Sequence, residues 1–216
     1  MVPASVWGVE WYLRAKGYQV LNLHYPSRRL PLAELVNRLH DAGQQFMHEG
    51  AGPLHIVAHS MGGLLARAYL ARHRPPNLGR VVMLGTPNGG SELADRLLRF
   101  PPYRWLFGPA GAQLGTRRED ALVQLLGRVD YPAGVIAGSR TWDVLGLLFL
   151  PRPHDGKVSV AGTMLDGMAD HITLPIGHTA LPWHPAALQQ TLHFLQHGRF
   201  DRAGRDGAGV AGGLGL

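Results

Sequence analysis

The 216-residue chain contains no cysteine, which excludes disulfides, thiolate metal sites and cysteine nucleophiles. Charged residues make up only 17%, and no block of five or more basic residues accompanies the net charge of +6. Nucleic-acid binding is not expected, because it uses clustered cations beside stacking aromatics. No apolar run approaches the roughly 18 to 20 residues of a membrane span. The start, MVPASVWGVEW, lacks the pattern of a signal peptide, so the chain as written is predicted to be cytoplasmic, without stable membrane insertion.

The composition that is present is typical of one folded domain. Hydrophobic residues at 45% supply enough apolar surface to offset the entropy of ordering the chain. We therefore predict a single domain over residues 1–200. The final stretch, RAGRDGAGVAGGLGL, is rich in glycine and has little to bury, so we predict a flexible tail over residues 201–216.

Short apolar strands alternate with amphipathic helices along the chain. The patterns predict helices over 5–16, 32–49 and 62–73, and strands over 18–23, 54–58, 80–84, 134–138 and 171–176. Such alternation is typical of βαβ units, so the predicted fold class is α/β: a three-layer α/β/α sandwich with a mostly parallel sheet.

Residues 91–128 interrupt this alternation with leucine-rich helical pieces around the proline-broken stretch FPPYRWLFGP. We interpret them as a helical, cap-like insertion. It either forms a layer over the sheet or caps an apolar pocket, in which case Trp105 and Phe107 are expected to face an acyl chain.

The stretch LHIVAHSMGG, residues 54–63, sets a serine between a predicted strand and a predicted helix. AHSMG fits the nucleophile elbow, small-x-Ser-x-Gly, with alanine in place of the usual first glycine. The sharp turn strains the serine and brings the positions two before and two after it together, so Ala58 and Gly62 must be small, while Gly63 permits close packing of the helix. Alternatively, Ser60 is only a helix N-cap. Its position directly after an apolar strand favours the nucleophile.

Four motifs in order, VAHSMGG, RVVMLGTPNGGSELAD, DGKVSV and GHTALP, resemble the α/β-hydrolase superfamily, and within it bacterial lipases and esterases. The resemblance covers about residues 5–200. It implies a parallel sheet, a Ser-acid-His triad in that chain order, and hydrolysis of carboxylic esters.

A serine nucleophile needs a base, which the resemblance places downstream. His178 stands in a turn between the last predicted strand and the closing helix, where this fold presents its base. His171 and His184 are the alternative bases. Each also has a structural explanation, because His171 begins a predicted strand and His184 begins a predicted helix. His59, beside the serine, is expected to point away from it across the elbow.

For the acid, the resemblance favours Asp155, because DGKVSV matches the acid loop of the family. Its carboxylate is expected to accept the Nδ1–H of the base and to hold the ring in the correct tautomer. Asp143 is the alternative, and Asp155-Gly156 is also simply a good turn.

The mechanism that follows has Ser60 attacking an ester carbonyl, His178 transferring the proton, and water hydrolysing the acyl-enzyme. The backbone N–H of Met61 would stabilise the oxyanion. The expected substrate is a small-molecule ester or a lipid, and no cofactor or metal is expected. His193 and His197 stand four apart on a helix, but without carboxylate support they are typical of a protein surface.

Two other functions fit the same residues. An acyltransferase, thioesterase or amidase uses an identical triad, because the pocket and not the triad selects the acceptor. The second function is that of a non-catalytic module, which binds a partner or lipid through residues 91–128.

The resemblance also implies a segment that this sequence lacks. The second oxyanion donor normally comes from a loop announced by His-Gly, and the chain opens beyond that loop. The strand expected between 18–23 and 54–58 is absent as well. Either the sequence is a fragment or a misassigned start of a longer protein, or residues 1–6 take over this role. We predict an N-terminally truncated fold that is poorly stable or weakly active by itself, and restored esterase activity when the upstream codons are added.

Overall fold

The computed structural model describes residues 6–27, 29–49, 52–97, 110–111, 113–117, 119–141 and 144–203. Its helices are α1 (Trp7–Ala15), α2 (Leu32–Glu49), α3 (Met61–Arg72), α4 (Glu92–Leu97), α6 (Asp120–Leu126), α7 (Val144–Phe149), α8 (Val160–Thr163) and α9 (Pro185–His197), with a 3₁₀ turn, η2, over His178–Ala180. Its strands are β1 (Leu54–His59), β2 (Leu78–Leu84), β3 (Ala133–Gly138) and β4 (Asp170–Leu174). With one exception, the predicted helices and strands lie within two residues of these bounds.

The four strands form one parallel sheet in the order β1-β2-β3-β4. Ala58 on β1 lies opposite Met83 on β2, which lies opposite Val135 on β3. Because parallel neighbours need crossovers, the helices between the strands pack back onto the sheet. The predicted α/β class with a parallel sheet is confirmed.

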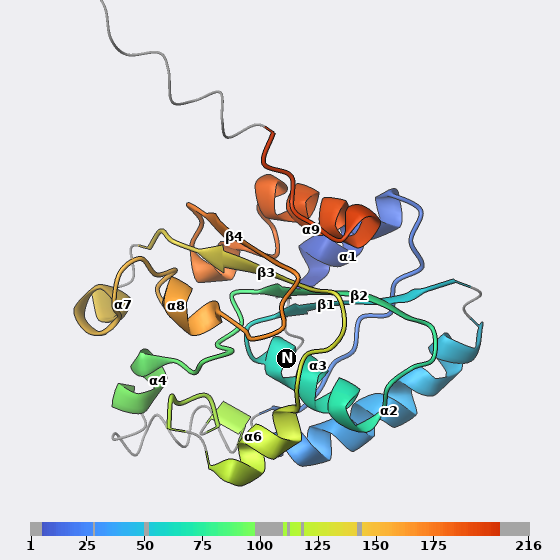
Figure 1. Cartoon of the computed structure of the whole chain (residues 1–216), viewed down its shortest axis with the longest axis horizontal. Helices are drawn as coiled ribbons and strands as arrows, with labels where there is room; N and C mark the ends of the chain where they lie inside the picture. The colour runs from blue at the N-terminus through green and yellow to red at the C-terminus, as the bar shows by residue number, and fades with distance from the viewer. Residues whose placement is uncertain are drawn as a thin grey trace, which may run out of the picture.

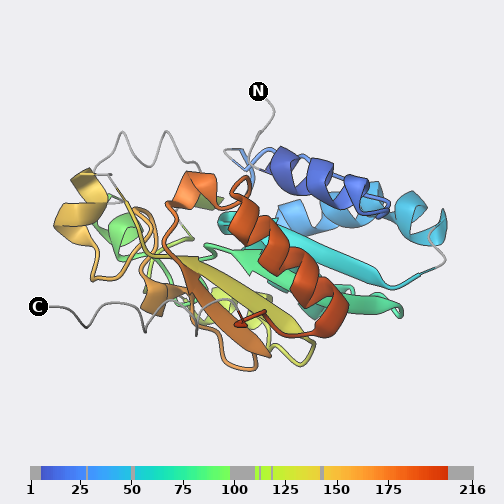
Figure 2. The ribbon, with the colours of Figure 1, turned by 90° about the horizontal axis from the view of Figure 1, so that it is seen from above.

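Helices cover both faces of the sheet, which gives three layers (Figure 1). Helices α1 and α9 lie on one face, and α2, α3 and α6 lie on the other (Figure 2). The side chains of β2 alternate between the two cores, as a strand buried on both faces requires: Val81 and Met83 join the α2/α3 side, and Val82 and Leu84 join the α1/α9 side.

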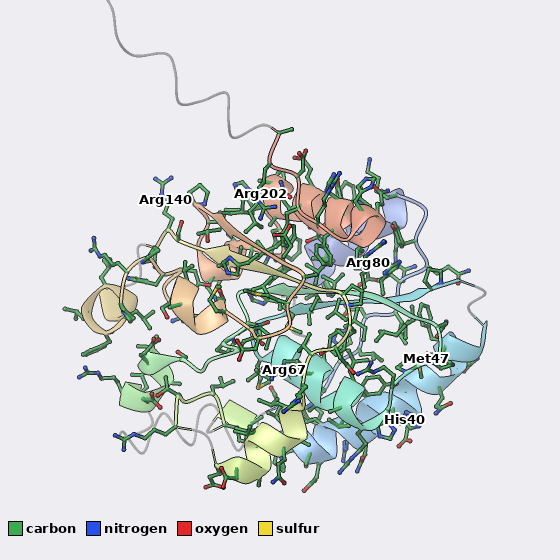
Figure 3. The ribbon with its side chains drawn as sticks, viewed as in Figure 1. His40, Met47, Arg67, Arg80, Arg140 and Arg202 are labelled. Atoms are coloured by element: carbon green, nitrogen blue, oxygen red, sulfur yellow. The ribbon has the colours of Figure 1, made fainter. Side chains whose placement is uncertain are left out.

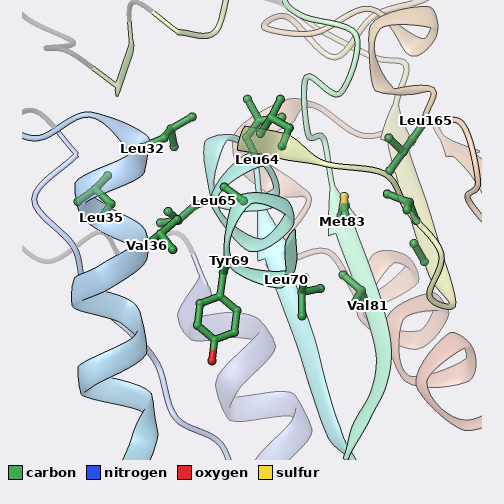
Figure 4. Close-up of a cluster of buried hydrophobic side chains, with 14 of the residues drawn as sticks. Leu32, Leu35, Val36, Leu64, Leu65, Tyr69, Leu70, Val81, Met83 and Leu165 are labelled. Atoms are coloured by element: carbon green, nitrogen blue, oxygen red, sulfur yellow. The ribbon is translucent and has the colours of Figure 1, made fainter. Parts of the chain in front are cut away.

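The larger core lies between α2, α3 and the sheet (Figure 4). Leu32, Leu35 and Val36 of α2 are fully buried against Leu64 and Leu65 of α3. Their spacing of three and four residues is the helical period that predicted α2 from the sequence. This packing holds α3, and with it the serine at its start, against β1.

Residues 18–23 are the exception: the predicted strand is wrong. The segment belongs to none of the strands of the sheet. A strand exists only through ladder hydrogen bonds to a neighbour, and among the described residues the sheet ends at β1, so no neighbour reaches this segment.

The 91–128 region contains α4 and α6, and two short helices that were not predicted, α7 and α8, follow it. Residues 98–109, with Trp105 and Phe107, lie outside the described residues, as do Asp143 and the tail from 204 onwards. None of the helices in the described ranges is long and apolar enough to span a membrane.

The end of the described chain is tied to the sheet beside β4. The guanidinium of Arg202 donates from Nη1 and Nη2 to the carboxylate of Asp170, at 2.9 and 2.6 Å (Figure 3). The backbone N–H of Phe200 donates to the same carboxylate at 2.7 Å. Asp170 therefore fastens the segment after α9 to the outer strand.

Candidate active site

Ser60 occupies a kink between β1 and α3. Its backbone, with φ 55° and ψ −128°, is the only one with positive φ among the described non-glycine residues. The N–H of Ser60 still donates to the carbonyl of Leu84 at 2.8 Å, so the kink starts at the last ladder bond of β1. Ser60 precedes α3, but its side chain forms no capping hydrogen bond. Its hydroxyl is therefore free to serve another group.

Small residues surround the kink because nothing larger fits. A Cβ on Gly63 would lie 2.1 Å from Oγ1 of Thr86, and a Cβ on Gly62 would lie 3.1 Å from the Tyr25 hydroxyl and 3.8 Å from the Cβ of Ala58. A contact under 3.0 Å forces a neighbour to move, so any side chain at 63 would displace Thr86 or α3.

His178 lies within hydrogen-bond distance of the Ser60 hydroxyl. Its Nε2 is 3.0 Å from Oγ of Ser60, although 118 residues separate the two in sequence. The imidazole comes from η2, the turn that follows β4, and its backbone N–H donates to the carbonyl of Asp155 at 3.0 Å. The residues that follow β1 and those that follow β4 thus lie at the same end of the parallel sheet, where the strands finish.

Asp155 holds the other side of the imidazole. Its Oδ2 lies 2.7 Å from Nδ1 of His178, and its side chain is completely buried. Its Oδ1 accepts the backbone N–H groups of Lys157 at 2.9 Å and Val158 at 2.8 Å. Because one oxygen is occupied by two donors, the other is aimed at the imidazole. The pair fixes the tautomer with the proton on Nδ1 and leaves Nε2 as an acceptor for the serine proton.

Gly85 allows this pair to lie directly against the end of β2. It has φ +55°, and a Cβ there would lie 3.1 Å from both Oδ2 of Asp155 and Nδ1 of His178. Any side chain at this position would press between the carboxylate and the imidazole. The glycine of LGTP was not singled out in sequence, and its reason is this close approach.

The alternative histidines lie elsewhere. His171 is on β4, where its Nε2 is 3.0 Å from Oγ1 of Thr163. His184 is the N-cap of α9, and its Nδ1 accepts the N–H of Ala186 at 3.2 Å. The structure thus brings together Ser60, His178 and Asp155.

His59 packs against the base, a contact that the sequence analysis did not anticipate. Its Nε2–H donates to the carbonyl of His178 at 3.0 Å, and the two imidazole centroids are 4.8 Å apart. Burial lowers the pKa of His59 to about 3, assisted by the neighbouring His178. A neutral ring at 59 therefore supports the backbone of the base and adds no charge beside it.

Two hydrogen-bond donors come from residues that line the same cavity as Ser60. Met61 begins α3, so its N–H is among those without an intrahelical acceptor. Tyr25 lines the same cavity as Ser60 and Met61. Burial raises the pKa of Tyr25 to about 12, so the phenol keeps its proton at neutral pH and can donate. In the described part of the chain, no three acidic or histidine side chains gather in a way that could hold a metal ion.

The comparisons with known proteins agree with this architecture. The model of the alpha/beta hydrolase fold family matches residues 32–135. A triacylglycerol lipase from Pseudomonas fragi is 40% identical over 72 residues, a stretch that covers 33% of this chain and 23% of that lipase.

Solved structures give wider coverage at lower identity. The lipase BlEst2 of Bacillus licheniformis, in its mature form, is 18% identical with a TM-score of 0.67, over 91% of this chain and 86% of that one. The phospholipase PlaB of Legionella pneumophila is 19% identical with a TM-score of 0.63, over 89% of this chain and 56% of that one. The parallel sheet, the kinked serine after β1 and these similarities lead to one conclusion: the chain has the α/β-hydrolase fold, and part of it is similar in sequence to a lipase.

Proposed function

We propose that this protein hydrolyses carboxylic esters through an acyl-enzyme on Ser60, with His178 as the base and Asp155 as the residue that orients it. One observation carries the proposal. The imidazole of His178 stands between the serine hydroxyl, at 3.0 Å, and a buried carboxylate, at 2.7 Å. A nucleophile, a base and an orienting acid in hydrogen-bond contact form the arrangement that activates serine.

In the proposed reaction, Oγ of Ser60 attacks the ester carbonyl while Nε2 of His178 takes its proton. Asp155 stabilises the imidazolium that forms. The oxyanion lies at the start of α3, where the N–H of Met61 and the positive end of the helix favour negative charge. The imidazolium then protonates the leaving alcohol. Water, activated by the same base, attacks the acyl-enzyme and releases the acid.

The substrate class is proposed from the relatives. The curated relative is described as a triacylglycerol lipase, and PlaB is described as a phospholipase. Both names refer to lipids as substrates. The substrate that we propose is therefore a small acyl ester or a lipid ester. Apolar side chains line the cavity beside Ser60, with Leu65 and Ala66 of α3 among them, and these suit an apolar acyl group.

Labelling with a fluorophosphonate probe tests the proposal, because only an activated serine reacts rapidly with it. The parent chain should be labelled at Ser60 and should hydrolyse p-nitrophenyl acetate, and Ser60→Ala should lose both activities. Ser139→Ala is the matched control: Oγ of Ser139 bonds only to the carbonyl of Leu174 in the described residues, so this variant should be labelled like the parent. A parent chain that the probe does not label is a non-catalytic scaffold, and the proposal is then wrong.

A further inference from the structure

We propose that His193 and His197 form a binding site for one transition-metal ion, Cu²⁺ or Zn²⁺, at the C-terminal end of α9. This inference is independent of the proposed function, because it concerns two side chains that take no part in the chemistry at Ser60. It is based on the closeness of the two rings, on a hydrogen bond that fixes the tautomer of one of them, and on the position of the pair at the end of a helix.

The two histidines lie one helical turn apart, so their side chains are neighbours on the surface of α9. Their ring centroids are 4.4 Å apart, and the ring planes are inclined by 47°. Two nitrogens that bind one ion at 2.0–2.1 Å lie about 3 to 3.5 Å from each other. The ring of His197 is exposed and forms no hydrogen bond within the described part of the chain, so it can turn to complete such a pair.

A backbone carbonyl fixes the tautomer of His193. The Nδ1 of this ring lies 2.9 Å from the carbonyl oxygen of Arg199. Because a carbonyl only accepts, Nδ1 carries the proton and donates it, and in the neutral ring Nε2 keeps its lone pair. Histidines that bind metals are oriented in this way, by a second ring nitrogen that donates to a carbonyl or carboxylate. The spacing of the two histidines alone predicts no metal site, because no carboxylate supports them, but the carbonyl of Arg199 supplies this support.

The chain that follows α9 holds the Arg199 carbonyl in place. Gly198, with φ 73°, ends the helix and reverses the direction of the backbone. Gln190 then exchanges two hydrogen bonds with the backbone of Asp201, donating to its carbonyl at 2.8 Å and accepting its N–H at 2.9 Å. The reversed segment therefore runs back along α9 past His193. A ring that is already oriented loses little conformational entropy when an ion binds.

The charges around the pair set a limit on its affinity. The last carbonyls of a helix carry a partial negative charge, which favours a cation beside His197. Against this, Arg80 donates to the carbonyl of Leu195 at 2.6 Å, and the side chain of Arg199 is exposed nearby. Among the described residues no third histidine or carboxylate joins the pair, so water must complete the coordination. We therefore expect weaker binding than in a closed site of four protein ligands.

The proposed metal site and the candidate active site lie at opposite ends of the sheet. Figure 2 shows α9 running back along the sheet, from the end of the strands toward their start. The segment after α9 is bonded to Asp170, the first residue of β4, whereas His178 follows the last residue of that strand. An ion bound at the end of α9 would thus stabilise the helix without contact with Ser60.

A second pair of close histidines, His40 and His73, is a poorer candidate. Their centroids are 4.0 Å apart, but the rings are stacked nearly parallel, at 16°, so their nitrogens do not converge on one point. The Nε2 of His40 lies 2.6 Å from the amide nitrogen of Gln44. Because an amide nitrogen donates, the lone pair of this ring nitrogen is already in use.

Isothermal titration calorimetry with CuCl₂ and ZnCl₂ tests the site. The variants are His193→Gln, whose amide can still donate to the Arg199 carbonyl, and His197→Ala. His24→Ala is the matched control, because His24 is also exposed but belongs to the segment after α1. MgCl₂ and CaCl₂ are the control ions, since both prefer oxygen ligands. Electron paramagnetic resonance of the Cu²⁺ complex reports the nitrogens that bind the ion, and circular dichroism checks that each variant is folded.

The parent chain and His24→Ala should bind one ion at this site, with Cu²⁺ bound more tightly than Zn²⁺ and without binding of Mg²⁺ or Ca²⁺. His193→Gln and His197→Ala should each weaken the binding of Cu²⁺ by about 10-fold or more, because the second ligand of a chelate binds at a high effective concentration. Zn²⁺ should raise the midpoint of thermal unfolding of the parent, and EDTA should reverse the rise.

Equal affinity of the parent and both histidine variants would overturn the proposal, as would a Cu²⁺ spectrum with a single nitrogen ligand. A loss of binding in His24→Ala as large as in the two variants would assign the metal to scattered surface histidines, which also contradicts the proposal.

Discussion

Replacing Asp155 with asparagine tests the proposed acid more sharply than deleting it. Oδ1 of Asp155 accepts two backbone N–H groups, those of Lys157 and Val158. An asparagine must keep its carbonyl oxygen there, so its NH₂ group replaces Oδ2, 2.7 Å from Nδ1 of His178. Two N–H donors would then face each other. The imidazole can escape this clash only by moving its proton from Nδ1 to Nε2.

The shifted proton removes the base. An Nε2 that carries hydrogen donates to the Ser60 hydroxyl and cannot accept its proton, although every heavy atom stays in place. Loss of the correct tautomer in a serine triad lowers kcat by about 10⁴-fold, which corresponds to about 5 kcal/mol of transition-state stabilisation. The expected result for Asp155→Asn is thus a near-complete loss of rate without loss of fold.

The assay is the rate constant for fluorophosphonate labelling, together with p-nitrophenyl acetate hydrolysis and a circular dichroism spectrum as a check of folding. Labelling has the advantage that it reports serine activation even where turnover is slow. Asp143→Asn is the control, because Asp143 is the alternative acid in the sequence. The tautomer reasoning is refuted if the labelling rate constant of Asp155→Asn lies within tenfold of that of the parent chain. It is also refuted if Asp143→Asn lowers the rate constant as much as Asp155→Asn does.

Three further predictions concern stability. Because the pKa of His59 falls from its usual 6.5 to about 3 on folding, the unfolded chain binds more protons between these values, so stability should fall by roughly 1 kcal/mol for each pH unit below 6.5. His59→Gln should weaken this acid dependence in urea titrations at pH 4 to 7, and an unchanged slope would contradict it. Gly63→Ala should lower the free energy of unfolding by about 1–3 kcal/mol through the clash with Thr86, which corresponds to a fall of roughly 3–10 °C in the midpoint of thermal unfolding. Adding Thr86→Ala should recover part of this loss. A Gly63→Ala chain as stable as the parent would argue against the packing described. Partial burial disfavours the charge of Asp170, but hydrogen bonds from Arg202 and two backbone N–H groups outweigh it and lower the pKa. Asp170→Asn should therefore destabilise the chain by about 1 kcal/mol at pH 7, and the difference from the parent should shrink as the pH falls below 4; a difference that persists there would mean that shape and not charge is responsible.

The four strands that pair were readable from the sequence because their burial leaves a local pattern. VVML in β2 and AGVIAG in β3 are runs without a polar side chain, which is what burial on both faces of a sheet requires. YQVLNL carries the same β-forming residues and forms no strand. β-propensity is a property of the segment by itself. A strand also needs a neighbouring strand to pair with, and in the described residues this segment has none.

The candidate site was predictable to the extent that it follows from local sequence and chain order. The elbow is contained in AHSMGG, and its small residues have steric reasons that the structure makes explicit. His178 and Asp155 needed the resemblance, because no local pattern joins residues 118 positions apart. Their distances agree with the roles that we predicted, and those roles stay predictions until variants are assayed.

The contact of His59 with the base could not be read from the sequence. The direction of a side chain beside a kink depends on the dihedral angles of the kink, and the φ of 55° at Ser60 is not encoded by periodicity. The same holds for Gly85, whose purpose is apparent only when the carboxylate and imidazole are seen beside it. Close approaches between distant segments are decided by tertiary packing.

The strained backbone of Ser60 has a consequence for how the protein should fail. A residue held at such angles carries about 1–3 kcal/mol of strain, a sizeable share of a typical stability of 5–15 kcal/mol. The rest of the domain must supply the force that holds it there, and relaxing the kink would withdraw the hydroxyl from the imidazole. Heat or mild denaturant should therefore abolish the reactivity of Ser60 toward the probe before the helices unfold. Loss of labelling would then be the first measurable sign of partial unfolding in this domain.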